Sequence, residues 1–127
     1  MSAKGVDLEL KKAFQELQAK VLDTTQKLKV ADLQIDSLTK TIQHAQLTQQ
    51  EIKSFPSDTN MYNGIGRMFL LTSPNDIVKM LSEKIDTSHK KIKELETSKT
   101  YLERSMKDSE ENLRELVASK QKDRNWI

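Results

Sequence analysis

The feature that most constrains this chain is a pair of long apolar patterns that follow the same rule. In each pattern the positions alternate at spacings of four and three residues, and ten of eleven positions are apolar in the first and nine of twelve in the second. This spacing averages 3.5 residues and keeps one stripe facing a partner helix, so it predicts coiled-coil seams. The first seam comprises Leu10, Phe14, Leu17, Val21, Thr24, Leu28, Ala31, Ile35, Leu38, Ile42 and Ala45. The second comprises Val78, Leu81, Ile85, Ser88, Ile92, Leu95, Lys99, Leu102, Met106, Ser109, Leu113 and Leu116.

Capping and breaking residues set the expected ends of the two helices. Asp7 is a candidate N-cap for the first helix, and Pro56 cannot continue it. The second helix has Ser73 as its cap and Pro74 at the first helical position, where proline is tolerated. For a single domain over 1–127 we therefore expect helices at about 7–53 and 74–122 and a disordered tail at about 123–127.

Two seams of matching length pair most simply within the same chain. At 35% hydrophobic and 31% charged residues, the composition is too lean for a large round core. An antiparallel pair of helices buries both seams and puts the two termini at one end. Polar seam residues such as Ser88, Lys99 and Ser109 weaken the coil locally, and such positions more often fix register than bind a ligand. The expected fold class is mainly α, a long antiparallel two-helix coiled coil.

The segment between the helices, about 59–72, is of another kind. It reads TNMYNGIGRMFLLT and holds the densest apolar cluster of the chain, interrupted by Gly64 and Gly66. It is predicted to form one β-hairpin, with its turn at Asn63-Gly64 or at Gly66-Arg67, and turn chemistry alone leaves both registers open. A two-stranded hairpin exposes two unpaired edges, so we expect it to pair with hairpins of other chains. The alternative is that it folds back and caps its own coil.

Composition excludes several classes of function. A formal charge of +2 with no long basic block speaks against nucleic-acid binding, and the absence of cysteine removes disulfides, thiolate zinc sites and a cysteine nucleophile. No signal-like or membrane-spanning apolar run is present, and a cytoplasmic location is expected. The GIG at 64–66 lacks the lysine of a nucleotide loop. We expect no enzyme activity, no catalytic residue, no metal and no cofactor.

The order of these motifs resembles a known family. A heptad helix, a hairpin with Tyr62, Gly66 and Phe69, and a second helix of equal length are similar to the β-type subunits of prefoldin. The stretches VDLELKKAFQELQAKV, TNMYNGIGRMFLL and KIKELETSKTYLERSMK carry the resemblance over nearly the whole chain.

The resemblance implies an ATP-independent co-chaperone. Two α-type and four β-type subunits, this chain and three further β-type ones among them, would join their hairpins into a β-barrel in a heterohexamer. Their coiled-coil tips would capture unfolded or nascent proteins, actin and tubulin included, and deliver them to the cytosolic group II chaperonin. The interface of this chain would comprise Met61, Tyr62, Ile65, Gly66, Met68, Phe69 and Leu71.

The client-binding tip is expected where the chain ends meet, at about 1–17 and 110–127. Apolar residues there exceed what one seam can bury, and non-directional apolar contact suits unfolded clients. The candidates are Val6, Leu8, Leu10, Phe14, Leu113, Leu116 and Val117. The plainer interpretation is that Val6, Leu8 and Leu113 complete the coil, and that Trp126 and Ile127 belong to a disordered tail.

Two alternatives belong to other functional classes. A structural coiled-coil adaptor would dimerise through the seams, but a parallel dimer would leave the central hairpin without a purpose. A basic-zipper DNA-binding protein would need a dense basic run before the heptads, and GVDLELKK is not one.

Overall fold

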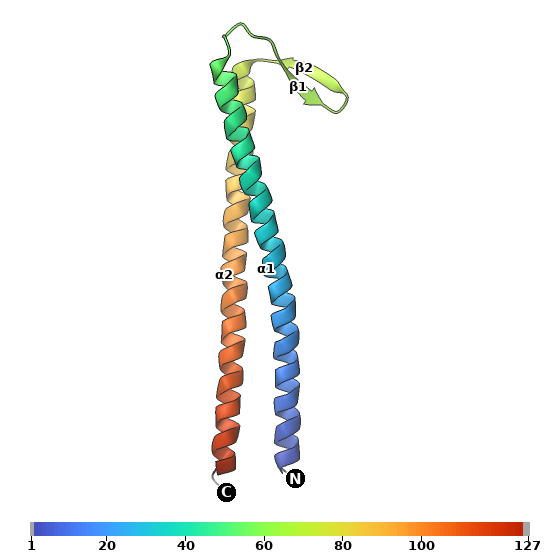
Figure 1. Ribbon diagram of the computed structural model, residues 1–127, viewed down its shortest axis with the longest axis vertical. Helices are drawn as coiled ribbons and strands as arrows, with labels where there is room; N and C mark the ends of the chain where they lie inside the picture. Colours follow the sequence, from blue (N-terminus) through green and yellow to red (C-terminus); the bar gives the residue numbers. More distant parts are fainter. Residues whose placement is uncertain (1, 126–127) are drawn as a thin grey trace. The chain divides into compact units, whose positions relative to one another are not determined.

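The computed structural model describes the backbone of residues 2–125 and the side chains of residues 8–122. Helix α1 (Ser2–Ser54) leads through strands β1 (Met61–Ile65) and β2 (Met68–Thr72) into helix α2 (Pro74–Asn125) (Figure 1). The expected fold class, two long helices around a central hairpin, is confirmed. Of the tail expected at 123–127, the first three residues continue α2, and 126–127 lie outside the described residues.

Of the four residues expected to start or stop a helix, Ser73, Pro74 and Pro56 agree with the observed helix ends and Asp7 does not. The Ser73 hydroxyl accepts a hydrogen bond from the backbone N–H of Asp76 at 3.2 Å, as an N-cap should, and Pro74 is the first residue of α2. At the other end of the connection, α1 stops at Ser54, two residues before Pro56. The exception is the start of α1, which lies at Ser2 and not at the expected Asp7 cap. No proline precedes Asp7, and one glycine costs a helix only about 1 kcal/mol.

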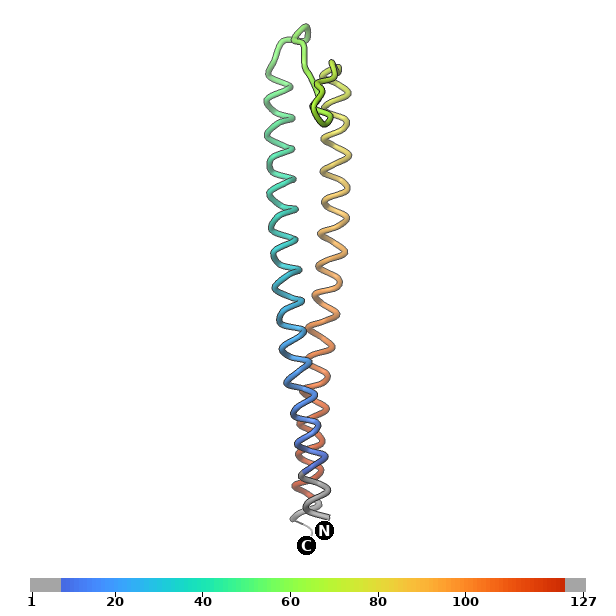
Figure 2. The backbone as a smooth tube through the Cα atoms, turned by 90° about the vertical axis from the view of Figure 1, so that its right-hand side faces the viewer, coloured from blue at the N-terminus to red at the C-terminus, as the bar shows by residue number. Residues whose placement is uncertain are grey.

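The chain divides into two compact units, each with a segment of both helices. We call them the terminal unit, Met1–Asp32 with Glu96–Ile127, and the hairpin unit, Leu33–Leu95. The backbone trace can be followed through each unit by its colours in Figure 2.

In the terminal unit, three lysines join α1 to α2. Lys20 donates to the Ser109 hydroxyl at 2.6 Å and to the Ser105 carbonyl at 3.4 Å. Lys99 forms an ion pair with Asp32, and Lys120 forms one with Glu9 at 2.6 Å. Residues early in α1 thus meet residues late in α2, which confirms the antiparallel pairing within this unit.

The hairpin unit is also antiparallel. Gln49 of α1 donates its side-chain amide to the Val78 carbonyl at 3.0 Å and to the Ser82 hydroxyl at 2.8 Å. The core of both units is thin, as the lean composition predicts. Among the described side chains, the buried ones are all seam residues, and most are small: Thr24, Ala31, Ile42, Ala45 and Ser88.

The β1–β2 sheet selects one of the two registers that the sequence leaves open. Ile65 pairs with Met68, so the turn lies at Gly66-Arg67, and the ladder extends to Met61 opposite Thr72. Gly66 has a φ of 60°, whereas none of the described non-glycine residues has a positive φ. A positive φ at the first turn residue followed by a negative φ at the second is typical of a type II′ turn, which matches the twist of a hairpin.

Lys99 shows how a polar seam residue is accommodated. The hydrogen bond that it donates to Asp32 raises the pKa of its ammonium above the ordinary 10.5. A raised pKa means that the folded state favours the charged lysine. The pair therefore stabilises the fold at neutral pH, and this effect is lost as the pH rises through the raised pKa.

We predict that Asp32→Asn lowers the melting temperature of the full-length chain at about pH 8, because Lys99 loses its partner. The difference from wild type should shrink as the pH rises through the raised pKa of Lys99, because the lysine then becomes neutral in both proteins. Thermal melts followed by circular dichroism measure this difference. Asp36→Asn is the matched control, because Asp36 pairs with Lys40 at 3.7 Å within α1 only. An effect of Asp32→Asn that is independent of pH would contradict the assignment.

Candidate functional site

One face of the hairpin is bare. Side chains alternate between the faces of a sheet, so Tyr62, Gly64, Phe69 and Leu71 share what we call the open face. The exposed fractions of Tyr62, Phe69 and Leu71 are 60%, 79% and 61%. A Cβ atom at position 64 would lie 3.6 Å from Cε1 of Phe69, so the glycine leaves room for the ring of its cross-strand partner. Three large apolar side chains thus face solvent on two short strands.

The opposite face is covered only in part. Asn63 donates its side-chain amide to the Met80 sulfur at 3.8 Å, which connects β1 to α2, and Met61 and Thr72 at the base are half-buried. Nearer the turn, Ile65, Met68 and Leu70 remain exposed. The exposure of both faces speaks against a hairpin that caps its own coil, because capping would bury at least one face.

The strand edges add backbone groups to this surface. In a two-residue hairpin the pair that closes the turn exchanges hydrogen bonds, and hydrogen-bonded and non-hydrogen-bonded pairs then alternate. With Ile65 and Met68 closing the turn, the N–H and C=O groups of the open-face residues point away from the ladder. Within residues 2–125 the sheet has two strands, so neither edge is paired with a further strand there. The open face therefore combines three apolar side chains with the outward backbone groups of all four residues.

A second candidate site lies in the terminal unit. A groove of about 610 Å³ runs between the late turns of α2 and the Phe14 region of α1. Its apolar lining includes Phe14, which is 50% exposed although it occupies a seam position. Charged groups of both signs, Glu110 and Arg114, stand beside the apolar residues. We call this the tip groove; its residues are Phe14, Leu17, Glu110, Leu113, Arg114, Val117, Ala118 and Gln121.

The structure brings together only some of the predicted tip residues. Phe14, Leu113 and Val117 line the tip groove, whereas Leu116 lines a neighbouring hollow of about 260 Å³ that Leu113 shares. Leu10 is half-buried and Leu8 is exposed, and neither lines these hollows. The Val6 side chain and the residues Trp126 and Ile127 lie outside what the structure describes. The predicted tip residues did not include Leu17, which belongs to the seam, or Glu110, Ala118 and Gln121, which lie outside it.

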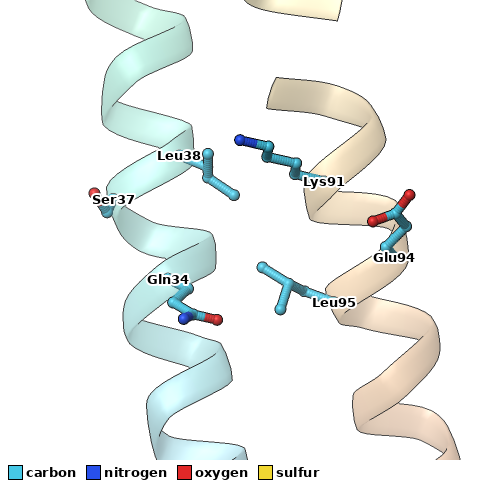
Figure 3. A pocket seen from close by; sticks show the side chains of 6 residues that line it. All are labelled: Gln34, Ser37, Leu38, Lys91, Glu94 and Leu95. Carbon is cyan, nitrogen blue, oxygen red and sulfur yellow. The ribbon is translucent and has the colours of Figure 1, made fainter. Parts of the chain in front are cut away.

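A further hollow, of about 460 Å³, lies in the hairpin unit. Leu38 and Leu95 point toward each other across it, and Lys91 and Gln34 also extend toward the gap, while Ser37 and Glu94 point away (Figure 3). Within the described part of the chain, no three metal-ligating side chains gather, and no helix has the length and apolarity to span a membrane.

Comparisons with known proteins agree with this architecture. The family model described as "Prefoldin subunit" matches residues 15–120. Prefoldin subunit 1 of Danio rerio is 58% identical over 118 residues, which cover 93% of this chain and 97% of the relative. Prefoldin subunit 1 of Homo sapiens is 55% identical over 118 residues, which cover 93% of this chain and 97% of that relative.

A solved structure supports the fold at lower identity. The crystal structure of the prefoldin beta subunit from Thermococcus strain KS-1 matches with a TM-score of 0.70 and 21% identity, over 84% of this chain and 90% of the other. The family match spans most of the chain, and the solved subunit has a similar fold. The chain therefore belongs to the prefoldin subunit family, with the chaperone-type role of that family.

Proposed function

We propose that this chain is one subunit of a heterohexameric, ATP-independent prefoldin in the cytoplasm. Its hairpin joins a β-barrel with the hairpins of two α-type and three further β-type subunits. Its helix ends capture unfolded or nascent proteins, including actin and tubulin, and the complex delivers them to the cytosolic group II chaperonin. The bare hairpin is the observation that carries the proposal.

The hairpin supports assembly through two kinds of contact at once. A neighbouring strand that adds to either edge would satisfy the outward backbone groups of the open-face residues, as in β-strand addition. Barrel closure would also cover Tyr62, Phe69 and Leu71, whose exposure is costly in an isolated chain. Another hairpin of the same kind meets both needs, because it also has unpaired edge groups and exposed apolar side chains.

The tip groove supports capture of unfolded chains. Its apolar lining offers contact of about 25 cal/mol per Å², and this contact does not depend on the sequence of the client. The groove is shallow and open, so each contact is weak, and several tips acting together would supply avidity. Glu110 and Arg114 keep the open groove hydrated without favouring clients of one charge.

The structural-adaptor alternative needs free seams. Within each unit, however, α1 already pairs with α2 of the same chain, through Lys20 and Ser109 in the terminal unit and through Gln49 and Val78 in the hairpin unit. A dimer through the seams would have to break these contacts. The hairpin is therefore the better surface for assembly.

We predict that Phe69→Asp combined with Leu71→Asp abolishes the hexamer, because two carboxylates on the open face cannot be buried in a barrel. Native mass spectrometry of the chain mixed with the α-type and other β-type subunits measures assembly. Leu47→Asp is the control, since Leu47 is equally exposed but lies on α1. A hexamer that still forms with the double variant would refute the assembly role of the hairpin.

We further predict that Phe14→Ser combined with Val117→Ser weakens suppression of client aggregation while the hexamer stays intact, because the groove loses apolar contact area. Aggregation of chemically unfolded actin, followed by light scattering, gives the readout. Leu22→Ser makes the same kind of change at a residue of the terminal unit that is 70% exposed and outside the groove. Equal losses in both variants would show that the groove has no special part in capture.

A further inference from the structure

The Glu9–Lys120 ion pair differs in burial between its two partners. Nζ of Lys120 donates to Oε2 of Glu9 at 2.6 Å, and the lysine side chain is only 14% exposed while the glutamate is 66% exposed. Most of the lysine is therefore packed between the helices, and its ammonium reaches out to a carboxylate that stays in water. A lysine packed in this way needs its partner more than a surface lysine does.

The position of Lys120 explains its burial. It follows Leu116 by four residues and so continues the α2 seam, three heptads after Lys99. A lysine at a seam position stabilises one helix pairing but weakens the apolar contact there. Among the side chains described, 8–122, this pair is the ion pair between the helices that lies nearest their terminal ends. After Leu116, this ion pair therefore joins α1 to α2 beside the apolar lining of the tip groove.

We propose that Glu9 and Lys120 form an electrostatic latch that restricts access to the apolar seam at the tip. With the latch closed, Leu10, Leu113 and Leu116 are held half-buried between the helices. With it open, the helix ends separate, and these leucines become available to an apolar client segment in addition to the tip groove. The proposal rests on the proposed client capture and adds its regulation by charge and salt.

The strength of the latch sets the expected size of the effect. An ion pair with one exposed partner is worth little in water and is screened by salt. Breaking it should therefore tighten client binding by up to about fivefold at low salt, and not by orders of magnitude. An effect of this size suits a tip that must open for clients and close without them.

Opening of the latch is measured first, without a client. The chain has no cysteine, so Gln15→Cys and Ser119→Cys place spin labels at two exposed, uncharged positions on α1 and α2 of the terminal unit. In this background Glu9→Gln should lengthen and broaden the distance distribution. The charge swap Glu9→Lys with Lys120→Glu should restore it. Asp23→Asn, which breaks an exposed pair with Lys27 inside α1, should leave it unchanged.

Capture is measured next, with the assembled complex and a reduced and alkylated, permanently unfolded protein as the probe. Glu9→Gln should bind the probe up to about fivefold more tightly than wild type at low salt, and about 1 M salt should remove the difference. Unchanged label distances in Glu9→Gln would overturn the latch, and so would longer distances with unchanged affinity. If Phe14→Ser with Val117→Ser also leaves probe binding unchanged, client capture at the tip fails instead, while the label distances still report on the latch.

Discussion

Backbone hydrogen bonding at the two free edges of the β1–β2 sheet is the constraint on which the rest of the structure depends. A strand edge must pair or stay in water, and in this hairpin the outward backbone groups belong to residues whose side chains avoid water, Tyr62, Phe69 and Leu71. Another strand resolves both problems together. The helices of this chain cannot cover these side chains instead, because their apolar seams already face each other within each unit.

Lysines, more than apolar volume, specify how the helices of the terminal unit align. The buried seam residues of this unit, Thr24 and Ala31, are small, so apolar packing by itself discriminates poorly between neighbouring registers. Lys20, Lys99 and Lys120 each reach a single set of partners, and a shift of one heptad would leave all three without them. In the proposed latch, the same chemistry would make the tip sensitive to salt, because salt screens the Glu9–Lys120 ion pair.

The apolar periodicity of the sequence predicts some features of this structure and leaves others open. Heptad spacing predicted the two helices, because each depends on one chain segment and its apolar stripe, and the matching lengths of the two seams predicted their antiparallel pairing. The hairpin register needed the structure, since Asn63-Gly64 and Gly66-Arg67 are both acceptable turns, and the observed pairing of Ile65 with Met68 places the turn at Gly66-Arg67. The lysine contacts and the tip-groove residues Ala118 and Gln121 depend on how two helices face each other, which no single segment encodes.

Hydrogen exchange at single-residue resolution tests the central claim, that the hairpin edges are completed by other subunits. The amides of Tyr62, Gly64, Phe69 and Leu71 point outward, so they should exchange rapidly in the isolated chain and become protected in the assembled complex. The amides of Ile65 and Met68, which close the turn, should show much smaller changes. Rapid exchange of all four outward amides in an intact complex would contradict the account, because it would leave the edges unpaired after assembly.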